Sequence, residues 1–187
     1  DGESNASYAG KPTQGRDAAW TELLQYSDVR LTAEELDNLD PTRKFEGVKL
    51  PDGGYLGTLT VFHELHCVKH LRHFLYASHY FPDLTPDQIE ARRIHLEHCI
   101  DLLRAGVMCR GDVAPLTMRW GHTQPKPLAN FSSAHRCVNW ESINDWARRR
   151  TVARLFEPGY LRHPILGDVF SSPGEALAAL IGAVKDP

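Results

Sequence analysis

One ten-residue pattern occurs twice in this sequence, and it constrains the fold more than any other feature. The two segments are HELHCVKHLR at residues 63–72 and HLEHCIDLLR at residues 95–104. Aligned without gaps, they share two histidines, a cysteine, a leucine and an arginine at the same positions. A single HxxHC can arise by chance, whereas two copies inside similar helical decamers predict two halves of one site.

Helical periodicity places the chemical groups of each copy on one side of a helix. Residues at i, i+3, i+4 and i+7 share a face. If the histidine-bearing faces of the two helices meet in the core of a helical bundle, four imidazoles come together. The bundle core is where helical proteins build metal sites. The residues expected on these faces are His63, His66, Cys67 and His70 in the first copy, and His95, His98, Cys99 and Leu102 in the second.

The remaining patterns predict a mainly α fold, a helical bundle with two central antiparallel HxxHC helices. The first central helix is expected at 60–78 and the second at 85–106, where Thr85 is the N-cap and Pro86 the first helical residue. The short loop at 79–84 makes them antiparallel neighbours. Other predicted elements are helices at 17–25, from Thr32 to near Pro41, within 134–150 and from Ser172, a small β-hairpin within 45–59, and irregular, disulfide-stapled loops, one at 108–128.

Length and charge limit the class of protein. A chain of 187 residues can bury the core of one domain, predicted at 17–187 after a polar linker at 1–16. The net charge of −3, without a long basic run, gives no indication of nucleic-acid binding. No apolar run reaches the ~20 residues of a membrane-spanning helix. A globular protein that binds a metal or a small molecule remains.

The four motif histidines have a structural alternative to metal binding. Single histidines are often buried and hydrogen-bonded in a core. Four of them in a duplicated pattern favour a metal, because several neutral imidazoles are costly to bury together without a cation. Imidazole ligands suit zinc, copper, iron or nickel. The predicted ligands and catalytic residues are His63, His66, His95 and His98.

The four cysteines allow three interpretations. Cys67 and Cys99 are zinc ligands, a disulfide between the two long helices, or inert core thiols. An oxidising compartment favours the disulfide, and Cys109 and Cys137 would then form a second one. The sequons at Asn5 and Asn130 predict glycosylation and point weakly to the secretory route.

Other polar residues extend the candidate site. His70 lies on the face of the motif histidines but is matched by Leu102 in the second copy, and His135 lies two residues before Cys137. Both are candidate additional ligands. The glutamates of the two copies could orient imidazoles, although solvation on the helix surface is favoured, and Asp112 is left open. Surface or loop positions are expected for His73, His79, His122 and His163, and helix surface for Glu64 and Glu97.

The doubled motif resembles the signature of the UstYa-like fungal oxidases. Each HxxHC is followed by LR, as in that family. Further similar segments stand in the family's order: DAAWTELL, LTAEEL, PDGGYLGTLTVFHELHC, MCRGD and HRCVNWESINDWA. The resemblance covers residues 17–146, and the chain beyond about Arg150 is longer than is usual in the family.

The resemblance implies a type II membrane protein with a lumenal catalytic domain, in the lumen of the secretory pathway and anchored by an N-terminal segment. It implies copper on His63, His66, His95 and His98, one ion or two, and work in secondary-metabolite biosynthesis. The expected substrates are a peptide or other natural-product intermediate, O₂ and, in some members, halide. Association with a second copy or a related family member is also implied.

We therefore expect a copper-dependent oxidoreductase that uses O₂ for C–H functionalisation: oxidative cyclisation, hydroxylation, desaturation or halogenation. The alternative is a non-catalytic scaffold or partner subunit, in which zinc or a disulfide staples the two helices. Hydrolytic zinc chemistry is disfavoured because no HExxH arrangement is present.

Overall fold

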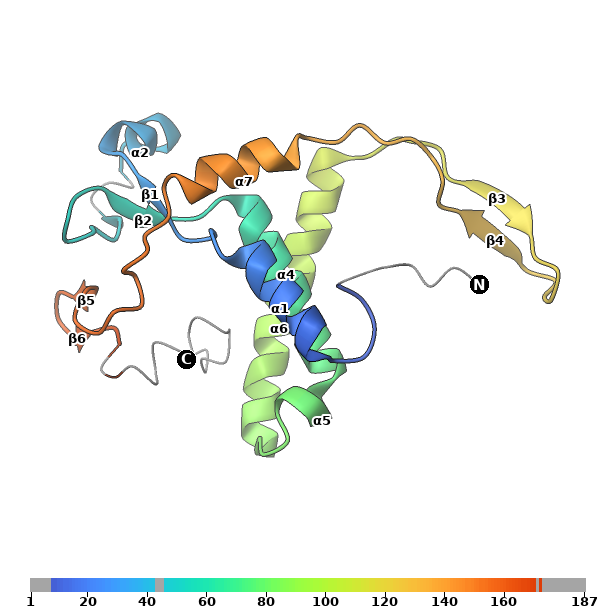
Figure 1. Ribbon diagram of the computed structural model, residues 1–187, viewed down its shortest axis with the longest axis horizontal. Coiled ribbons are helices and arrows are strands. Elements are labelled where there is room, and N and C mark those ends of the chain that lie inside the picture. Colours follow the sequence, from blue (N-terminus) through green and yellow to red (C-terminus); the bar gives the residue numbers. More distant parts are fainter. Residues whose placement is uncertain (1–7, 43–45, 171, 173–187) are drawn as a thin grey trace.

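The computed structural model describes residues 8–42, 46–170 and 172, and within them the fold is mainly α, as predicted. Two long helices, α4 and α6, form the centre, and α1 lies against α4 (Figure 1). The helices are α1 (Gln14–Leu24), α2 (Ala33–Leu39), α4 (Thr60–Leu75), α5 (Ala77–Tyr80), α6 (Pro86–Arg110) and α7 (Trp140–Arg148). The strands are β1 (Val29–Leu31), β2 (Tyr55–Gly57), β3 (Thr117–Trp120), β4 (Pro127–Asn130), β5 (Arg162–His163) and β6 (Gly167–Asp168).

Capping chemistry sets several helix starts where the sequence predicts them. Thr32 and Glu35 form a capping box at α2, and Thr85 and Gln88 form another at α6, with a proline in the first turn. The end of α6 was predicted near Gly106, but the helix continues to Arg110 and stops at Gly111, which is left-handed at φ +43°. The second central helix is therefore longer than expected.

Within the hairpin predicted at 45–59, the described residues 46–59 form a turn, and the strand that follows the turn has its main partner elsewhere. Lys49 bridges Tyr55 around the turn, as a small hairpin would. Strand β2, however, pairs antiparallel with β1, with Val29 opposite Gly57 and Leu31 opposite Tyr55. A side chain at residue 57 would collide with Leu31, so glycine permits this close pairing. The predicted local hairpin is thus part of a longer-range sheet.

The prediction of an irregular segment at 108–128 was wrong. Strands β3 and β4 form an antiparallel hairpin in which Thr117 faces Asn130 and Trp120 faces Pro127. The hairpin lies away from the helices (Figure 1). All four residues of β3 are exposed. The prolines in this segment therefore delimit an arm of regular structure that carries no buried face of its own.

The first long helix also ends earlier than predicted. It stops at Leu75 instead of near Ser78, and the chain continues into the short helix α5. This break turns Tyr80 back onto α4, where its hydroxyl donates to Asp17 Oδ1 at 2.5 Å. Arg72 donates to the same carboxylate at 3.1 Å and also contacts the Tyr80 hydroxyl. One buried arginine therefore holds α1, α4 and α5 together.

Two hydrophobic clusters form the core of the described residues, and one of them includes a central helix. The first joins β1, α4 and α7 through Val29, Phe62 and Ala147, all with 0% exposure. The second is built by the chain beyond α7, and its buried residues are Leu50, Val152, Leu155, Tyr160 and Leu161. The extension beyond Arg150 thus completes a core against the β1–β2 region.

Several predictions fall at the edges of this description. The helix predicted from Ser172 and the sequon at Asn5 lie outside the described residues. Helix α1 begins at Gln14, inside the stretch predicted as a linker at 1–16, with Thr13 as its N-cap. Within the described residues, no helix combines the length and apolar character needed to cross a bilayer.

Candidate metal centre

Helices α4 and α6 pack in opposite directions, and their contact brings both copies of the motif together. His63 lies beside His98 with ring centroids 6.2 Å apart, while His70, further along α4, lies beside the earlier His95 at 5.6 Å. Residue numbers therefore increase along α4 in the direction in which they decrease along α6. This is the antiparallel packing that the short loop at 79–84 predicts. The five rings form a closed circuit of neighbours in the order His63, His66, His70, His95 and His98, with adjacent centroids no more than 6.5 Å apart.

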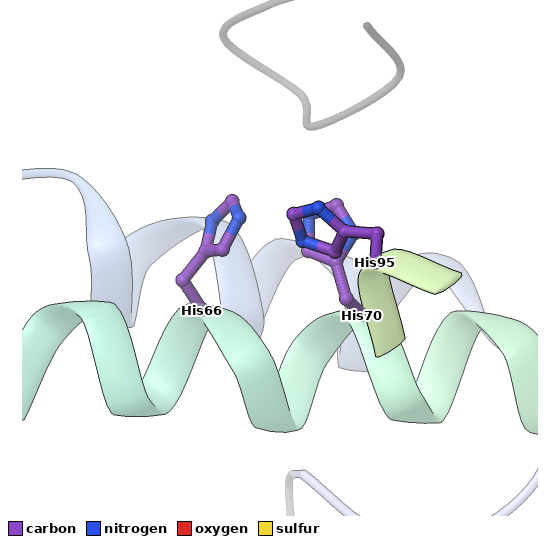
Figure 2. Close-up of side chains that lie close together, drawn as sticks. All are labelled: His66, His70 and His95. Atoms are coloured by element: carbon purple, nitrogen blue, oxygen red, sulfur yellow. The ribbon is translucent and has the colours of Figure 1, made fainter. Parts of the chain in front are cut away.

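The tightest part of this circuit is a group of three imidazoles. His66 and His70 are one turn apart on α4, with ring centroids separated by 4.1 Å, and His95 reaches them from α6 (Figure 2). Each ring offers one nitrogen that lies within 4.8 Å of the other two. Three imidazoles at this spacing are a suitable donor set for one transition-metal ion.

His70 is the most enclosed member of the group, with an exposed fraction of 7%. Burial, followed by the positive charge of neighbouring imidazoles and Arg92, lowers its pKa to about 3. The ring is therefore neutral at physiological pH, the form in which imidazole binds metals. Its Nε2 is buried and has no hydrogen-bond partner among the described residues. A metal ion would satisfy that nitrogen.

A small pocket opens beside this group. Its volume is about 10 Å³, room for one water-sized group. The lining residues come from α4, from the start of the loop after α5, and from α6: His70, Phe74, Phe81, Arg92, His95 and Leu96. The candidate centre therefore has an adjoining space in which a small ligand or part of a substrate can lie.

The grouping differs from the predicted tetrad. His63 and His98 are paired with each other at the other side of the circuit, and His98 is exposed. His70, the residue without a counterpart in the repeat, takes a place among the three closest imidazoles. Of the four predicted principal ligands, the structure brings His66 and His95 into this group, and the roles of all four stay predictions.

His135 is placed outside the group of three. Its Nδ1 lies 2.6 Å from Asp112 Oδ2, and both side chains are exposed. Hydrogen bonding from the backbone of Ala114, followed by this contact, lowers the pKa of Asp112. A ligand role for His135 stays a prediction, and the role of Asp112, which contacts His135, stays open.

Two surface assignments were wrong. His73 is buried and stacks on Tyr80, with ring centroids 4.1 Å apart, and burial lowers its pKa to about 4. Glu64 is also buried, and its Oε1 accepts a hydrogen bond from Arg110 at 2.8 Å. Gly106 allows this approach, because a Cβ there would collide with the Glu64 carboxylate. The glycine on the second long helix was the sequence feature that could have indicated this close contact with Glu64.

The other surface assignments are confirmed. His79, His122 and His163 are exposed, and Glu97 pairs with Arg93 on the solvent side of α6. Asn130 ends β4, where its side chain donates to Thr117 and accepts from the backbone of Ser132. Its glycosylation stays a prediction.

The cysteines divide into a buried pair and an exposed pair. Cys67 and Cys99 have 0% exposure and lie on α4 and α6, within the same interface as the histidines. Cys109 and Cys137 are exposed, and no disulfide joins any of the four cysteines in this structure. The buried positions fit any of the three sequence interpretations, so both disulfides stay predictions.

Comparison with known proteins gives a family for this arrangement. The family model described as "Mycotoxin biosynthesis protein UstYa" matches residues 1–150, which include both copies of the motif. The chain belongs to the UstYa family. This confirms the resemblance that the doubled HxxHC indicated.

Curated relatives from fungi support the same assignment. The UstYa family oxidase phomYc of Diaporthe leptostromiformis is 30% identical over 80% of this chain and 61% of its own length. Transacylase cctO of Talaromyces islandicus is 33% identical over 80% of this chain and 54% of its own. UstYa family oxidase aprY of Aspergillus flavus is 29% identical over 87% and 52%.

The match to these UstYa relatives is partial in length. The chain spans between half and two thirds of the three relatives named above. No solved structure matches the fold. The geometry of the histidine circuit therefore rests on this chain's own residues.

Proposed function

We propose that the protein is a copper-dependent oxidoreductase of fungal secondary-metabolite biosynthesis. The observation that carries the proposal is the convergence of His66, His70 and His95 from two antiparallel helices. The names of its relatives, which include family oxidases and the hydroxylase cctR of Talaromyces islandicus, support the reaction class. We extend the proposal to C–H functionalisation of a natural-product intermediate by cyclisation, hydroxylation, desaturation or halogenation.

The donor set fits copper. Three imidazoles bind divalent copper more tightly than the other first-row divalent ions, according to the general order of stability. Bound copper supplies one-electron exchange and reaction with O₂, which protein side chains do not provide. Zinc is the alternative ion for the same nitrogens. A second ion, in addition to the first, would bind between His63 and His98, whose ring centroids are 6.2 Å apart.

The protein's own residues have three tasks in this proposal. His66, His70 and His95 would hold the ion through one ring nitrogen each, and burial lowers the pKa of His70 to about 3, which keeps that ring neutral. Phe74 and Leu96 supply apolar wall to the adjoining pocket. The pocket itself leaves a place for a reacting group close to the imidazoles. The same site can serve each of the proposed outcomes, because substrate shape then decides which bond changes.

We place this activity in the lumen of the secretory pathway, in a catalytic domain that an N-terminal segment attaches to the membrane. The two sequons and the even number of cysteines support that compartment. An oxidising lumen would allow the Cys67–Cys99 and Cys109–Cys137 disulfides without removing any imidazole from the metal. Association with a second copy or a related family member is part of the same proposal.

Metal analysis combined with product analysis tests the function. Purified protein is loaded with copper or zinc, and a pool of candidate intermediates is examined by mass spectrometry after exposure to O₂, with and without halide. We expect mass changes of oxidation or halogenation only in the copper sample. Tightly bound zinc that copper does not displace, with no product, would favour the non-catalytic scaffold.

A further inference from the structure

The pocket beside the three imidazoles contains one charged side chain, Arg92. Of the six lining residues none is acidic. Arg92 lies one turn before His95 and Leu96 on α6, so all three share the helix face that meets α4. The pocket thus combines an apolar wall, two imidazoles and a guanidinium.

Among the described residues, Arg92 has no carboxylate partner, unlike its neighbour in the sequence. Arg93, the next residue, binds Glu90 at 2.7 Å and Glu97 at 3.1 Å on the exposed side of the helix. Among the described residues, no carboxylate forms an ion pair with Arg92. Its contact is the Phe81 ring, whose centroid lies 4.0 Å from the guanidinium carbon. Stacking on an aromatic ring leaves the N–H groups at the edge of the guanidinium plane free to donate.

The charge of Arg92 lies beside the candidate centre. Arg92 lines the same pocket as His70 and His95, so the guanidinium and the two imidazoles border one small space. A half-buried cation for which the described residues supply no carboxylate favours an anionic ligand. The volume of about 10 Å³ holds one water-sized group, such as a single carboxylate oxygen, so the rest of the ligand would lie outside the pocket.

We propose that Arg92 anchors a carboxylate of the substrate at the mouth of the metal centre. The inference rests on the proposed function for its relevance to catalysis, but the anion site itself is defined without a metal. A carboxylate held by the planar guanidinium would fix the substrate's end. The reacting bond would then lie a set distance along the molecule, next to His70 and His95. Arg92 would in this way select carboxylate-bearing substrates and position them.

The chain offers a matched control for testing this anchor. Arg92→Gln removes the charge from the pocket, and Arg92→Lys keeps the charge but loses the planar fork. Arg93→Gln makes the same change one residue away, on the solvent side and in an ion pair of its own. Circular dichroism and thermal unfolding of the three variants verify that each is folded.

The experiment measures binding of acetate to the metal-free protein by ligand-observed NMR, with acetamide as the neutral analogue. We expect acetate to bind the wild type and Arg93→Gln equally. Arg92→Gln should weaken binding roughly ten- to a hundredfold, as loss of a charge-assisted hydrogen bond predicts. Arg92→Lys should be intermediate, and acetamide should not compete.

Two model ligands separate the sources of the carboxylate. N-acetylalanine carries it at the end of a peptide, and the α-amide of N-acetylaspartic acid carries it on a side chain. The ligand that loses more affinity in Arg92→Gln identifies the source. Acetate binding that is undetectable in the wild type, or equal in Arg92→Gln and Arg93→Gln, would overturn the proposal.

Copper binding by the same variants is measured separately. We expect Arg92→Gln to keep the copper stoichiometry of the wild type, because Arg92 is not a ligand. Loss of acetate binding with intact copper binding supports the anchor. A wild type that binds acetate through Arg92 but no copper would overturn the proposed function and leave the anion site standing.

Discussion

The two copies of the repeated decamer carry similar residues but have different surroundings. Helix α4 buries seven residues, whereas the longer α6 buries two. The difference arises because α4 packs against α1, α5 and α6, while the main contact of α6 is α4. Equivalent positions in the repeat are therefore placed in different environments.

The arginine shared by both copies illustrates this contrast. Arg72 is buried and binds Asp17 on α1, whereas Arg104 is exposed and binds Asp101 on its own helix. The shared cysteines, unlike the arginines, have the same environment in both copies, since Cys67 and Cys99 are both fully buried. Sequence repetition preserves the groups at the helix interface, and the surrounding elements decide the role of the rest.

The largest expected effect concerns the histidine that breaks the repeat. His70→Leu makes the first copy match the second, and it removes one of the three converging imidazoles. Copper affinity should fall roughly a hundredfold or more, beyond the 10–100-fold typical of groups that only support a ligand. Competitive titration with a copper chelator measures the change.

His98→Leu is the matched control from the second copy. His98 lies outside the group of three, and its ring is exposed. Its replacement should therefore lower the affinity for the first copper less than His70→Leu does. Equal losses in His70→Leu and His98→Leu would contradict the asymmetric site. Far-ultraviolet circular dichroism confirms that both variants are helical.

The next effect separates the two shared arginines. Arg72→Gln leaves Asp17 and Tyr80 without their cation in a largely buried network, and should lower the free energy of unfolding by about 2–4 kcal/mol. Urea denaturation followed by circular dichroism measures it. A loss below the error of the method would show that α1 is held by its apolar contacts alone.

The two buried cysteines should respond alike. Cys67→Ser and Cys99→Ser each place a hydroxyl in a site with 0% exposure, which should cost about 1–3 kcal/mol of unfolding free energy. Denaturation with and without a reducing agent also tests the disulfide. If Cys67 and Cys99 are bonded to each other, reduction destabilises the wild type more than either variant, which can keep only the Cys109–Cys137 disulfide.

The smallest effect is expected at the solvent-exposed arginine. Arg104→Gln removes an ion pair with Asp101 between side chains that are 55% and 71% exposed. Such pairs contribute little, so stability should stay within about 0.5 kcal/mol of the wild type. A loss as large as that of Arg72→Gln would show that this face of α6 is covered in solution.

Local patterns predicted much of the fold. The capping boxes at Thr32 and Thr85 and the helical period of both decamers indicated the helix starts and the histidine-bearing faces correctly. These signals depend on residues within one or two turns. Pairing of β1 with β2 joins segments more than twenty residues apart, and three-residue strands carry too few residues for a recognisable alternation.

The site was predicted in outline but not in its grouping. Spacing placed His63, His66 and His70 on one face, but it could not show the register of α4 against α6. That register brings His70 of α4 into contact with His95 of α6. Arg92 was not singled out, because an arginine near the start of a helix is usually solvated, and the lack of a carboxylate partner among the described residues depends on three-dimensional contacts.

The central claim is that His66, His70 and His95 hold one metal ion between the two copies. Pulsed electron paramagnetic resonance of the singly copper-loaded protein counts the imidazole nitrogens bound to the metal. The account predicts three in the wild type, two in His70→Leu and three in His98→Leu. An unchanged count in His70→Leu, with a lower count in His98→Leu, would contradict it.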